Sequence, residues 1–419
     1  MQTTLSDTFK NSADGQIAES ILRNCVHCGF CLATCPSYQI LGNELDSPRG
    51  RIYLIKQLVE GHDVSAKTQL HLDRCLTCRN CETTCPSGVE YGKLLDIGRA
   101  LVDAQVPRGP VDSAQRVLLS QVIPRRRLFT ALLRIGQAMR LLLPRRLKNS
   151  IPVATPAACD ARPREHARKM LLLEGCAQPA LAPNINAAAI RVLDRLGITL
   201  YPVAEAGCCG AVSFHLNDHA RGLDAMRRNI DAWLPHLDAG AEAIVITASG
   251  CGVTVKDYAW HLRDDPVYAA RATRISAATL DLSEVVAQAG ETLNLPATTR
   301  VRVAFHPPCT LQHGQQIHDV VEPLLTRAGY ELTPVAESYL CCGSAGTYSI
   351  LQPAIAEALQ VRKLDHLQAG APDVIATANI GCITHLQAGT TTPVRHWIEL
   401  LDEAQRSDHP RMAAAANLR

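Results

Sequence analysis

Two short cysteine runs near the start of the chain constrain its fold most strongly. The first reads "CVHCGFCLATCP" (25–36) and the second "CLTCRNCETTCP" (75–86). Each follows the spacing C-x2-C-x2-C-x3-C-P, which is typical of bacterial ferredoxins with two [4Fe-4S] clusters. In that arrangement three closely spaced thiolates bind one cluster, and the fourth, next to the proline, binds the other. The two runs are therefore expected to fold together around two shared metal sites.

This ligand rule predicts two sets of cysteines, each of which combines both runs. The sets are Cys25, Cys28, Cys31 and Cys85 for the first cluster, and Cys75, Cys78, Cys81 and Cys35 for the second. Zinc is the alternative, but zinc sites usually take two C-x2-C pairs with a longer gap. The third close cysteine and the proline favour iron and sulfur. His27, Thr77 and Arg79 lie among the ligands and either adjust the redox potential or merely pack or face solvent.

Composition and termini indicate a cytoplasmic protein. Seventeen cysteines in 419 residues, grouped in short runs, are typical of metal binding in a reducing compartment. Only Cys159 stands apart, and we interpret it as a spectator thiol. No apolar stretch is long enough to span a membrane, and the N-terminus lacks the features of a secretory signal. The net charge of +2 predicts no nucleic-acid partner.

Residues 104–166 are expected to form a basic connector punctuated by proline. Between Ser113 and Cys159 the chain carries nine positive charges and no Asp or Glu. The segment "RRRLFTALLRIGQAMRLLLPRR" (125–146) spaces apolar residues as a helix does: Leu128, Leu132, Ile135, Met139 and Leu142. Such a helix either lies on an anionic membrane surface or packs on a neighbouring domain or partner. Peripheral contact with the cytoplasmic face of the inner membrane is therefore one hypothesis.

Residues 167–299 and 300–419 repeat one pattern. "GITLYPVAEAGCCG" (197–210) returns as "GYELTPVAESYLCCG" (329–343), and "LDAGAEAIVITASGC" (237–251) returns as "LQAGAPDVIATANIGC" (367–382). Strand-like runs alternate with helical runs in both copies, which predicts two α/β units with parallel sheets.

The predicted fold class is therefore multidomain, α and α/β. Residues 1–103 form a helical, ferredoxin-like domain for two clusters, and the two duplicated cysteine-rich α/β units follow the connector. In the N-terminal domain, "SPRGRIYLIKQLVEG" (47–61) predicts one helix between the cysteine runs. We expect each domain to have its own core.

Each unit carries four cysteines, and in both copies the first lies 32 positions before an adjacent pair. The two sets are Cys176, Cys208, Cys209 and Cys251, and Cys309, Cys341, Cys342 and Cys382. These positions are expected where strands run into loops, which is where open sheets gather binding residues. Gly210 and Gly343 allow a tight turn behind each pair. Four thiols suffice for a cluster or a zinc ion; the alternatives are thiols kept for packing and redox-active pairs.

The repeats resemble the cysteine-rich domain of heterodisulfide reductases, of the anaerobic glycerol-3-phosphate dehydrogenase C subunit and of lactate-utilisation proteins. With the ferredoxin runs, "SPRGRIYLIKQ", "LEGCAQP" and "AEAGCCGAV", nearly the whole chain resembles the iron–sulfur subunits of bacterial glycolate oxidase. That resemblance implies an electron-transfer subunit that is not catalytic alone. Its partners would be FAD-containing subunits that oxidise glycolate to glyoxylate, and it would pass electrons toward a quinone or another acceptor.

One departure from the related pattern bears on function. Heterodisulfide reductase repeats end in CxxC, whereas here the tetrapeptides are "CGVT" and "CITH", which end in Thr254 and His385. The missing thiol argues against disulfide cleavage, and His385 is a candidate substitute ligand. No Rossmann fingerprint, P-loop or nucleophile elbow is present, so we expect no flavin on this chain.

Three alternative functions remain open from the sequence. One is a thiol/disulfide enzyme with the repeats as its active site, and another is a binding module whose zinc-loaded repeats dock partners. The third is the electron-transfer subunit of a related lactate or glycerol-3-phosphate dehydrogenase, because substrate choice would lie in the flavin subunit.

Overall fold

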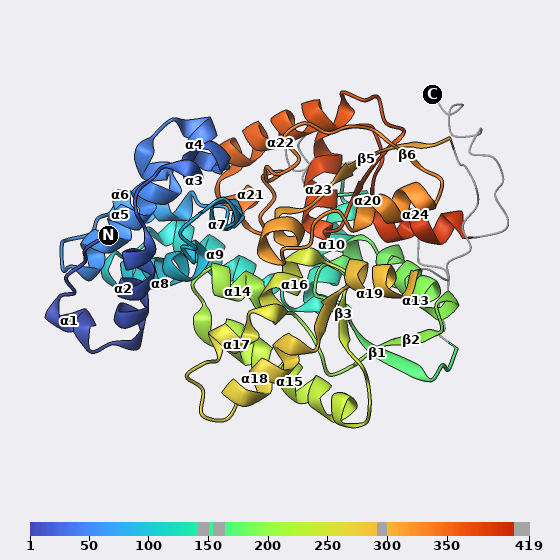
Figure 1. The fold of residues 1–419 in the computed structure, drawn as a ribbon, viewed down its shortest axis with the longest axis horizontal. Helices are drawn as coiled ribbons and strands as arrows, with labels where there is room; N and C mark the ends of the chain where they lie inside the picture. Colours follow the sequence, from blue (N-terminus) through green and yellow to red (C-terminus); the bar gives the residue numbers. More distant parts are fainter. Residues whose placement is uncertain (141–150, 154–163, 291–299, 406–419) are drawn as a thin grey trace.

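The computed structural model describes residues 1–140, 151–153, 164–290 and 300–405. Figure 1 shows a helical N-terminal domain at one end of the molecule and two α/β units beside it. The predicted fold class is confirmed, because the helical cysteine domain is followed by two units built on parallel sheets. The exact domain boundaries remain a prediction.

Short helices dominate the N-terminal domain. They are α1 (Asp7–Lys10), α2 (Ala13–Asn24), α3 (Phe30–Thr34), α4 (Pro36–Leu41), the 3-10 helix η1 (Glu44–Asp46), α5 (Pro48–Val59), α6 (Ala66–Asp73), α7 (Asn80–Thr83) and α8 (Tyr91–Gln105). Helix α5 is the one predicted between the cysteine runs. It begins at Pro48, and the Ser47 side chain accepts a hydrogen bond of 3.0 Å from the Gly50 amide. The structure adds α4, η1 and α6 between the runs.

The first unit is built around a parallel sheet in the order β2-β1-β3-β4. Its elements are β1 (Arg168–Leu173), α12 (Gln178–Leu181), α13 (Asn184–Arg195), β2 (Ile198–Pro202), α14 (Ala211–His215), α15 (His219–Asp238), β3 (Ile244–Ile246), α16 (Ser249–Lys256), α17 (Tyr258–His261), α18 (Ala269–Ala277), β4 (Thr279–Asp281) and α19 (Leu282–Ala289).

The second unit repeats this topology as β6-β5-β7-β8, again parallel throughout. Its elements are β5 (Arg302–His306), the π-helical turn η3 (Thr310–Gly314), α20 (Val321–Arg327), β6 (Glu331–Leu332), α21 (Tyr348–Leu351), α22 (Pro353–Gln368), β7 (Val374–Thr377), α23 (Ile380–Gly389), β8 (Val394–His396) and α24 (Trp397–Ala404). Strands β4 and β8 each lie at one end of a four-stranded sheet.

The two units share a hydrophobic core as well as having cores of their own. Leu172 and Ile185 of the first unit belong to the same buried cluster as Phe305 and Trp397 of the second. Helix α13 packs against α24, and the Arg191 guanidinium of α13 lies 2.7 Å from a carboxylate oxygen in α24. Each unit thus has a core of its own, as expected, and a further core lies between the two units.

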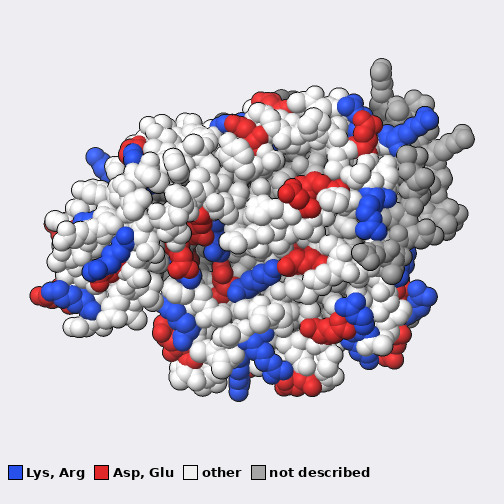
Figure 2. Space-filling model, in the orientation of Figure 1, with Lys and Arg blue, Asp and Glu red and all other residues white. Residues whose placement is uncertain are grey.

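The part of the basic connector that the structure describes contains α9 (Pro110–Val122) and α10 (Arg126–Ala138). Apolar residues predicted to line one side of the helix are exposed: Leu128, Leu132 and Ile135 on α10, and Met139 directly after it. Leu142 and Cys159 lie outside the described residues. None of the helices within the described ranges is long and apolar enough to cross a membrane. On the face drawn in Figure 2, charges of both signs are interspersed.

Candidate functional site

One pocket of the N-terminal domain is lined by cysteines from both runs. Its walls include Cys25, Cys28 and Cys31 of the first run and Cys85 of the second, and Cys81 also reaches it. The structure therefore brings together the four cysteines predicted for the first cluster. Cys28 is exposed whereas Cys25 is buried, so this site opens to solvent on one side.

The cysteines predicted for the second cluster are buried together. Cys35, Cys75, Cys78 and Cys81 are each no more than 8% exposed. Burial, with the neighbouring thiols Cys309 and Cys75, raises the pKa of Cys78 well above its usual range. Burial, with Cys78 and Cys75, does the same to the pKa of Cys81. Such thiols ionise when a metal takes the place of their protons, so these residues fit a buried cluster.

A network of buried polar groups fixes the loop that carries Cys35. The Arg51 side chain donates to the His71 carbonyl oxygen at 2.6 Å and to Ser37 Oγ at 3.1 Å. Ser37 Oγ in turn donates to the Asp46 carbonyl oxygen at 2.9 Å and lies 3.3 Å from Cys35 Sγ. The thiol of Cys35, a predicted ligand, is thereby held by groups that are themselves hydrogen-bonded, as the residues around metal ligands commonly are.

The loops between the cysteines adopt the same unusual backbone conformation in both runs. His27 and Thr77 have φ values of 55° and 53°, and Gly29 and Arg79 at the next matching position have values of 86° and 59°. Left-handed φ is uncommon for residues other than glycine and collects at functional sites. The Thr77 amide donates to Cys75 Sγ at 3.4 Å, which would stabilise a thiolate there.

The four cysteines of the first unit meet at the carboxyl edge of its sheet. Cys176 follows β1, the adjacent pair Cys208 and Cys209 follows β2, and Cys251 lies in α16 after β3. Hydrogen bonding to Cys176 lowers the pKa of Cys208 well below its usual range, and hydrogen bonding to Cys208 and Cys251 raises that of Cys209. The predicted placement of thiols at strand ends is thus observed, and the Cys208 and Cys209 thiols interact with those of Cys176 and Cys251 respectively.

Two side chains hydrogen-bond to the backbone of the adjacent cysteine pair in the first unit. Asn229 Nδ2 donates to the Cys208 carbonyl oxygen at 2.9 Å, and the Tyr258 hydroxyl donates to that of Cys209 at 2.8 Å. Gly210 has a φ of 94°, and a Cβ there would lie 2.7 Å from a backbone oxygen of α15. Glycine is therefore required both by the conformation and by the close approach of the helix.

The second unit gathers its four cysteines at the equivalent edge. Cys309 Sγ donates to Cys341 Sγ at 3.7 Å, and Cys342 Sγ donates to Cys382 Sγ at 3.4 Å. All four are buried. Gly343 has a φ of 94°, with a backbone oxygen of α22 only 2.5 Å from the place of a Cβ.

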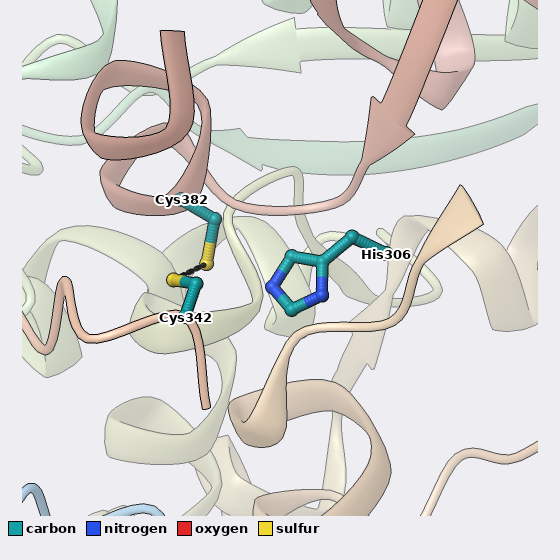
Figure 3. A group of neighbouring side chains, drawn as sticks. All are labelled: His306, Cys342 and Cys382. Carbon is teal, nitrogen blue, oxygen red and sulfur yellow. Dashed lines mark hydrogen bonds between the residues drawn. The ribbon is translucent and has the colours of Figure 1, made fainter. Parts of the chain in front are cut away.

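A histidine that we did not single out from the sequence joins this second group. His306 ends β5, and one ring nitrogen lies within 4.8 Å of the sulfurs of Cys342 and Cys382, which Figure 3 shows pointing toward the same space. The only signal in the sequence is its position three residues before Cys309. His385, the candidate that we chose instead, makes a 3.3 Å hydrogen bond to a backbone oxygen of α22 and is not part of this sulfur group.

A buried ammonium distinguishes the second unit from the first. Lys363 is 2% exposed and donates to the Glu337 and Ser338 carbonyl oxygens at 2.6 and 3.5 Å. Burial lowers the pKa of Lys363 to about 8, while the thiol of Cys342 opposes that shift. In the first unit Asn229 takes the corresponding place on the helix after the cysteine pair. The second site therefore has a nearby positive charge, which favours thiolates over thiols.

The second ferredoxin site packs directly against the second unit. Cys78 belongs to one buried cluster with Cys309, Cys341 and Tyr348. Asn80 Nδ2 donates at 3.2 Å to a carbonyl oxygen in the loop before the second unit's cysteine pair. The cysteines of the N-terminal domain and of the second unit are thus contiguous, although they are more than two hundred residues apart in sequence.

Family models match three parts of the chain. Residues 21–89 match the model described as a 4Fe-4S dicluster domain. Residues 170–256 and 303–387 each match the model of a cysteine-rich domain. Both predicted kinds of cysteine site therefore have a counterpart among known domains, and the predicted iron–sulfur cofactors are confirmed.

Curated relatives align with nearly the whole chain. The glycolate oxidase iron-sulfur subunit of Escherichia coli (strain K12) is 53% identical over 405 residues, which cover 96% of this chain and 99% of that protein. A probable glycolate oxidase iron-sulfur subunit of Bacillus subtilis (strain 168) is 29% identical over 92% of each chain. Lactate utilization protein A of Shouchella clausii is 24% identical and matches 55% of this chain and 97% of its own.

One solved structure has a similar fold. A hypothetical protein from Helicobacter pylori superposes with a TM-score of 0.53 at 10% identity, over 95% of this chain and 73% of that protein. At this level of identity the likeness concerns the fold alone.

Proposed function

Because the chain belongs to the family of glycolate oxidase iron–sulfur subunits, we propose that it relays electrons from an FAD-containing partner that oxidises glycolate to glyoxylate toward a quinone or another acceptor. As a member of that family it is an oxidoreductase component in electron transfer and is not catalytic alone. The proposed ligands are Cys25, Cys28, Cys31 and Cys85 for one cluster, and Cys75, Cys78, Cys81 and Cys35 for the other. Bound there, the clusters would store and pass single electrons.

The observation that carries this proposal is the different exposure of the two cysteine sets. Cys28 of the first set is exposed, whereas Cys78 of the second is buried against the second unit. A partner can therefore approach the first site directly, and the second site lies further inside. This order supports entry of electrons at the first site and their passage inward.

The surface beside Cys28 is suited to docking the flavin subunit. Val26 and Phe30 flank this thiol in the sequence, are 66% and 61% exposed, and line the same pocket as Cys28, so they form an apolar patch beside it. An aromatic residue at the centre of a docking surface commonly contributes about 2 kcal/mol or more to binding. We propose that the FAD-containing subunit covers Val26, Cys28 and Phe30, so that electrons enter where a ligand thiol reaches the surface.

Phe30→Asp tests this docking surface. The substitution places a charge in the interface, so the partner concentration for half-maximal cluster reduction should rise about 10- to 30-fold. The measurement is bleaching of cluster absorbance after glycolate is added to the reconstituted complex under anaerobic conditions. Iron content and reduction by dithionite should stay unchanged, because Phe30 is exposed.

Val361→Asp provides the matched control, since Val361 on α22 is 59% exposed and lies away from the cluster pocket. It should leave the partner concentration for half-maximal cluster reduction unchanged. Equal weakening by both substitutions would place the docking surface elsewhere.

If the chain reduced a disulfide substrate without any partner, the thiol/disulfide enzyme would be the better description.

We also propose that α10 lies on an anionic membrane surface. Its exposed apolar residues include Leu132 and Ile135, the exposed Met139 directly follows it, and Arg125 and Arg134 lie on the same segment. An apolar stripe flanked by arginines is typical of helices that lie at the lipid interface. This location would hold the complex near a lipid-soluble acceptor such as a quinone.

Deletion of residues 124–148 is expected to abolish co-sedimentation with vesicles that contain anionic lipid. Iron content should be unchanged, because the cysteine sites lie elsewhere. Vesicles of neutral lipid alone serve as the control and should bind the intact chain weakly, since each basic residue near an anionic surface contributes about 1 kcal/mol. Undiminished sedimentation of the deleted chain would exclude this role for α10.

A further inference from the structure

The environment of His306 is unusual for a buried histidine. His306 is only 1% exposed, and neither nitrogen of its ring has a hydrogen-bond partner among the described residues. Unpaired buried polar groups are unfavourable, so they are rare unless a ligand satisfies them. The matched contrast is His396 at the end of β8, whose Nε2 lies 2.9 Å from a carbonyl oxygen and whose Nδ1 accepts from the Ile398 amide at 3.2 Å.

The space that the His306 ring faces is lined by two thiols. Cys342 Sγ and Cys382 Sγ are 3.4 Å apart, and one ring nitrogen lies within 4.8 Å of both sulfurs. Figure 3 shows the three side chains converging from β5, the loop after β6, and α23. A single tetrahedral ion with metal–sulfur bonds of about 2.3 Å holds two thiolate sulfurs about 3.8 Å apart. A cubane instead spreads its thiolates over separate iron atoms, which places them further apart.

The internal repeat shows that this histidine is not needed by the fold. Cys309 of the second unit corresponds to Cys176 of the first, so His306 corresponds to Leu173. Leu173 is also buried and is packed in the core of its own unit. The same strand end therefore accepts an apolar side chain in one copy and carries an unpaired imidazole beside two thiols in the other.

We propose that the second unit binds one divalent metal ion of the zinc type through His306, Cys342 and Cys382, at a site that the first unit does not share. Imidazole and thiolate are the ligands that zinc prefers, and three closely spaced protein ligands of this kind are sufficient to define a site. Cys341, which adjoins Cys342 in the chain and interacts with its thiol, is a candidate for the fourth position. Such an ion would not exchange electrons; it would fix the loop whose Cys341 packs against Cys78.

Zinc X-ray absorption on the whole chain, purified anaerobically with its clusters, tests this site. We expect about one zinc per chain, with zinc–sulfur distances near 2.3 Å and zinc–nitrogen distances near 2.0 Å from imidazole. The absorption edge is specific to zinc, so iron in the ferredoxin domain does not interfere. In His306→Leu, which restores the side chain of the first unit, zinc affinity in a chelator competition should fall at least about 10-fold.

Matched variants keep the result interpretable. Iron content should remain at about eight atoms in His306→Leu, which reports that the N-terminal domain is intact. If that variant misfolds, His306→Gln keeps a polar side chain of similar reach and should still lose the imidazole signal. His385→Leu, in the same unit but hydrogen-bonded to the backbone, should retain it. Zinc far below one per chain, an imidazole signal that persists in both His306 variants, or additional iron that disappears in Cys342→Ser would each overturn the proposal.

Discussion

Replacement of Cys85 by alanine is expected to remove the first cluster, although Cys85 belongs to the second cysteine run. The structure places this residue in one pocket with Cys25, Cys28 and Cys31. Iron content should fall from about eight to about four atoms per chain. Glycolate-dependent electron transfer should fall at least about 100-fold, because mutation of a residue that only hydrogen-bonds to a metal ligand already lowers metal affinity or activity about 10- to 100-fold. Iron analysis, EPR of the reduced chain and an assay with the flavin partner measure the three effects.

The comparison with other cysteine variants makes this prediction specific. Cys25→Ala should give the same residual EPR signal as Cys85→Ala, whereas Cys35→Ala should give the complementary one. Cys159→Ala should change neither iron content nor electron transfer, because Cys159 stands outside the cysteine clusters of the sequence. If Cys85→Ala instead matched Cys75→Ala, each run would bind its own cluster and the crossed ligand sets would be wrong.

Asp46→Ala is expected to destabilise the N-terminal domain by about 3–5 kcal/mol. The Asp46 carboxylate is fully buried and faces three cationic or protonatable groups: Arg74 Nη1 at 3.0 Å, His71 Nδ1 at 2.9 Å and Arg51 Nη2 at 3.6 Å. Its removal leaves the buried guanidinium of Arg51 without its carboxylate. Because the Arg51 guanidinium also donates to Ser37 Oγ beside Cys35, its displacement should loosen the loop that carries this predicted ligand as well.

The measurement is guanidinium-induced loss of cluster absorbance under anaerobic conditions. Glu44→Ala is the matched control, because Glu44 pairs with Arg49 at 2.8 Å on the surface of the same loop. An exposed ion pair contributes about 0–1 kcal/mol to the free energy of unfolding. The guanidinium midpoint of Glu44→Ala should therefore differ little from that of the unchanged chain. Equal shifts for the two variants would show that the buried network does not hold the cluster loops.

The cysteine sites could be predicted from the sequence where the signal is local. Spacing within each run predicts which thiols lie close together, and the structure places Cys25, Cys28 and Cys31 around one pocket. The repeated strand and helix pattern likewise predicts parallel sheets, which place the thiols of each unit at one edge. Helix α5 carries its own start signal in the Ser47 cap and Pro48.

Features that depend on distant parts of the chain could not be predicted in this way. Strands β4 and β8 are three residues each, too short to show a period. His306 approaches Cys342 and Cys382 only because parallel strands end at the same edge of the sheet. The contact of Cys78 with Cys309 depends on how the domains pack, and nothing in the local sequence of either residue indicates it.

Iron and sulfide analysis combined with a reductive titration of the intact chain tests the central claim most directly. A relay with two [4Fe-4S] clusters predicts about eight iron atoms, about eight sulfides and the uptake of about two electrons per chain, and glycolate should deliver those electrons when the flavin partner is present. A chain with no acid-labile sulfide, or with zinc in place of iron at the ferredoxin cysteines, would contradict it.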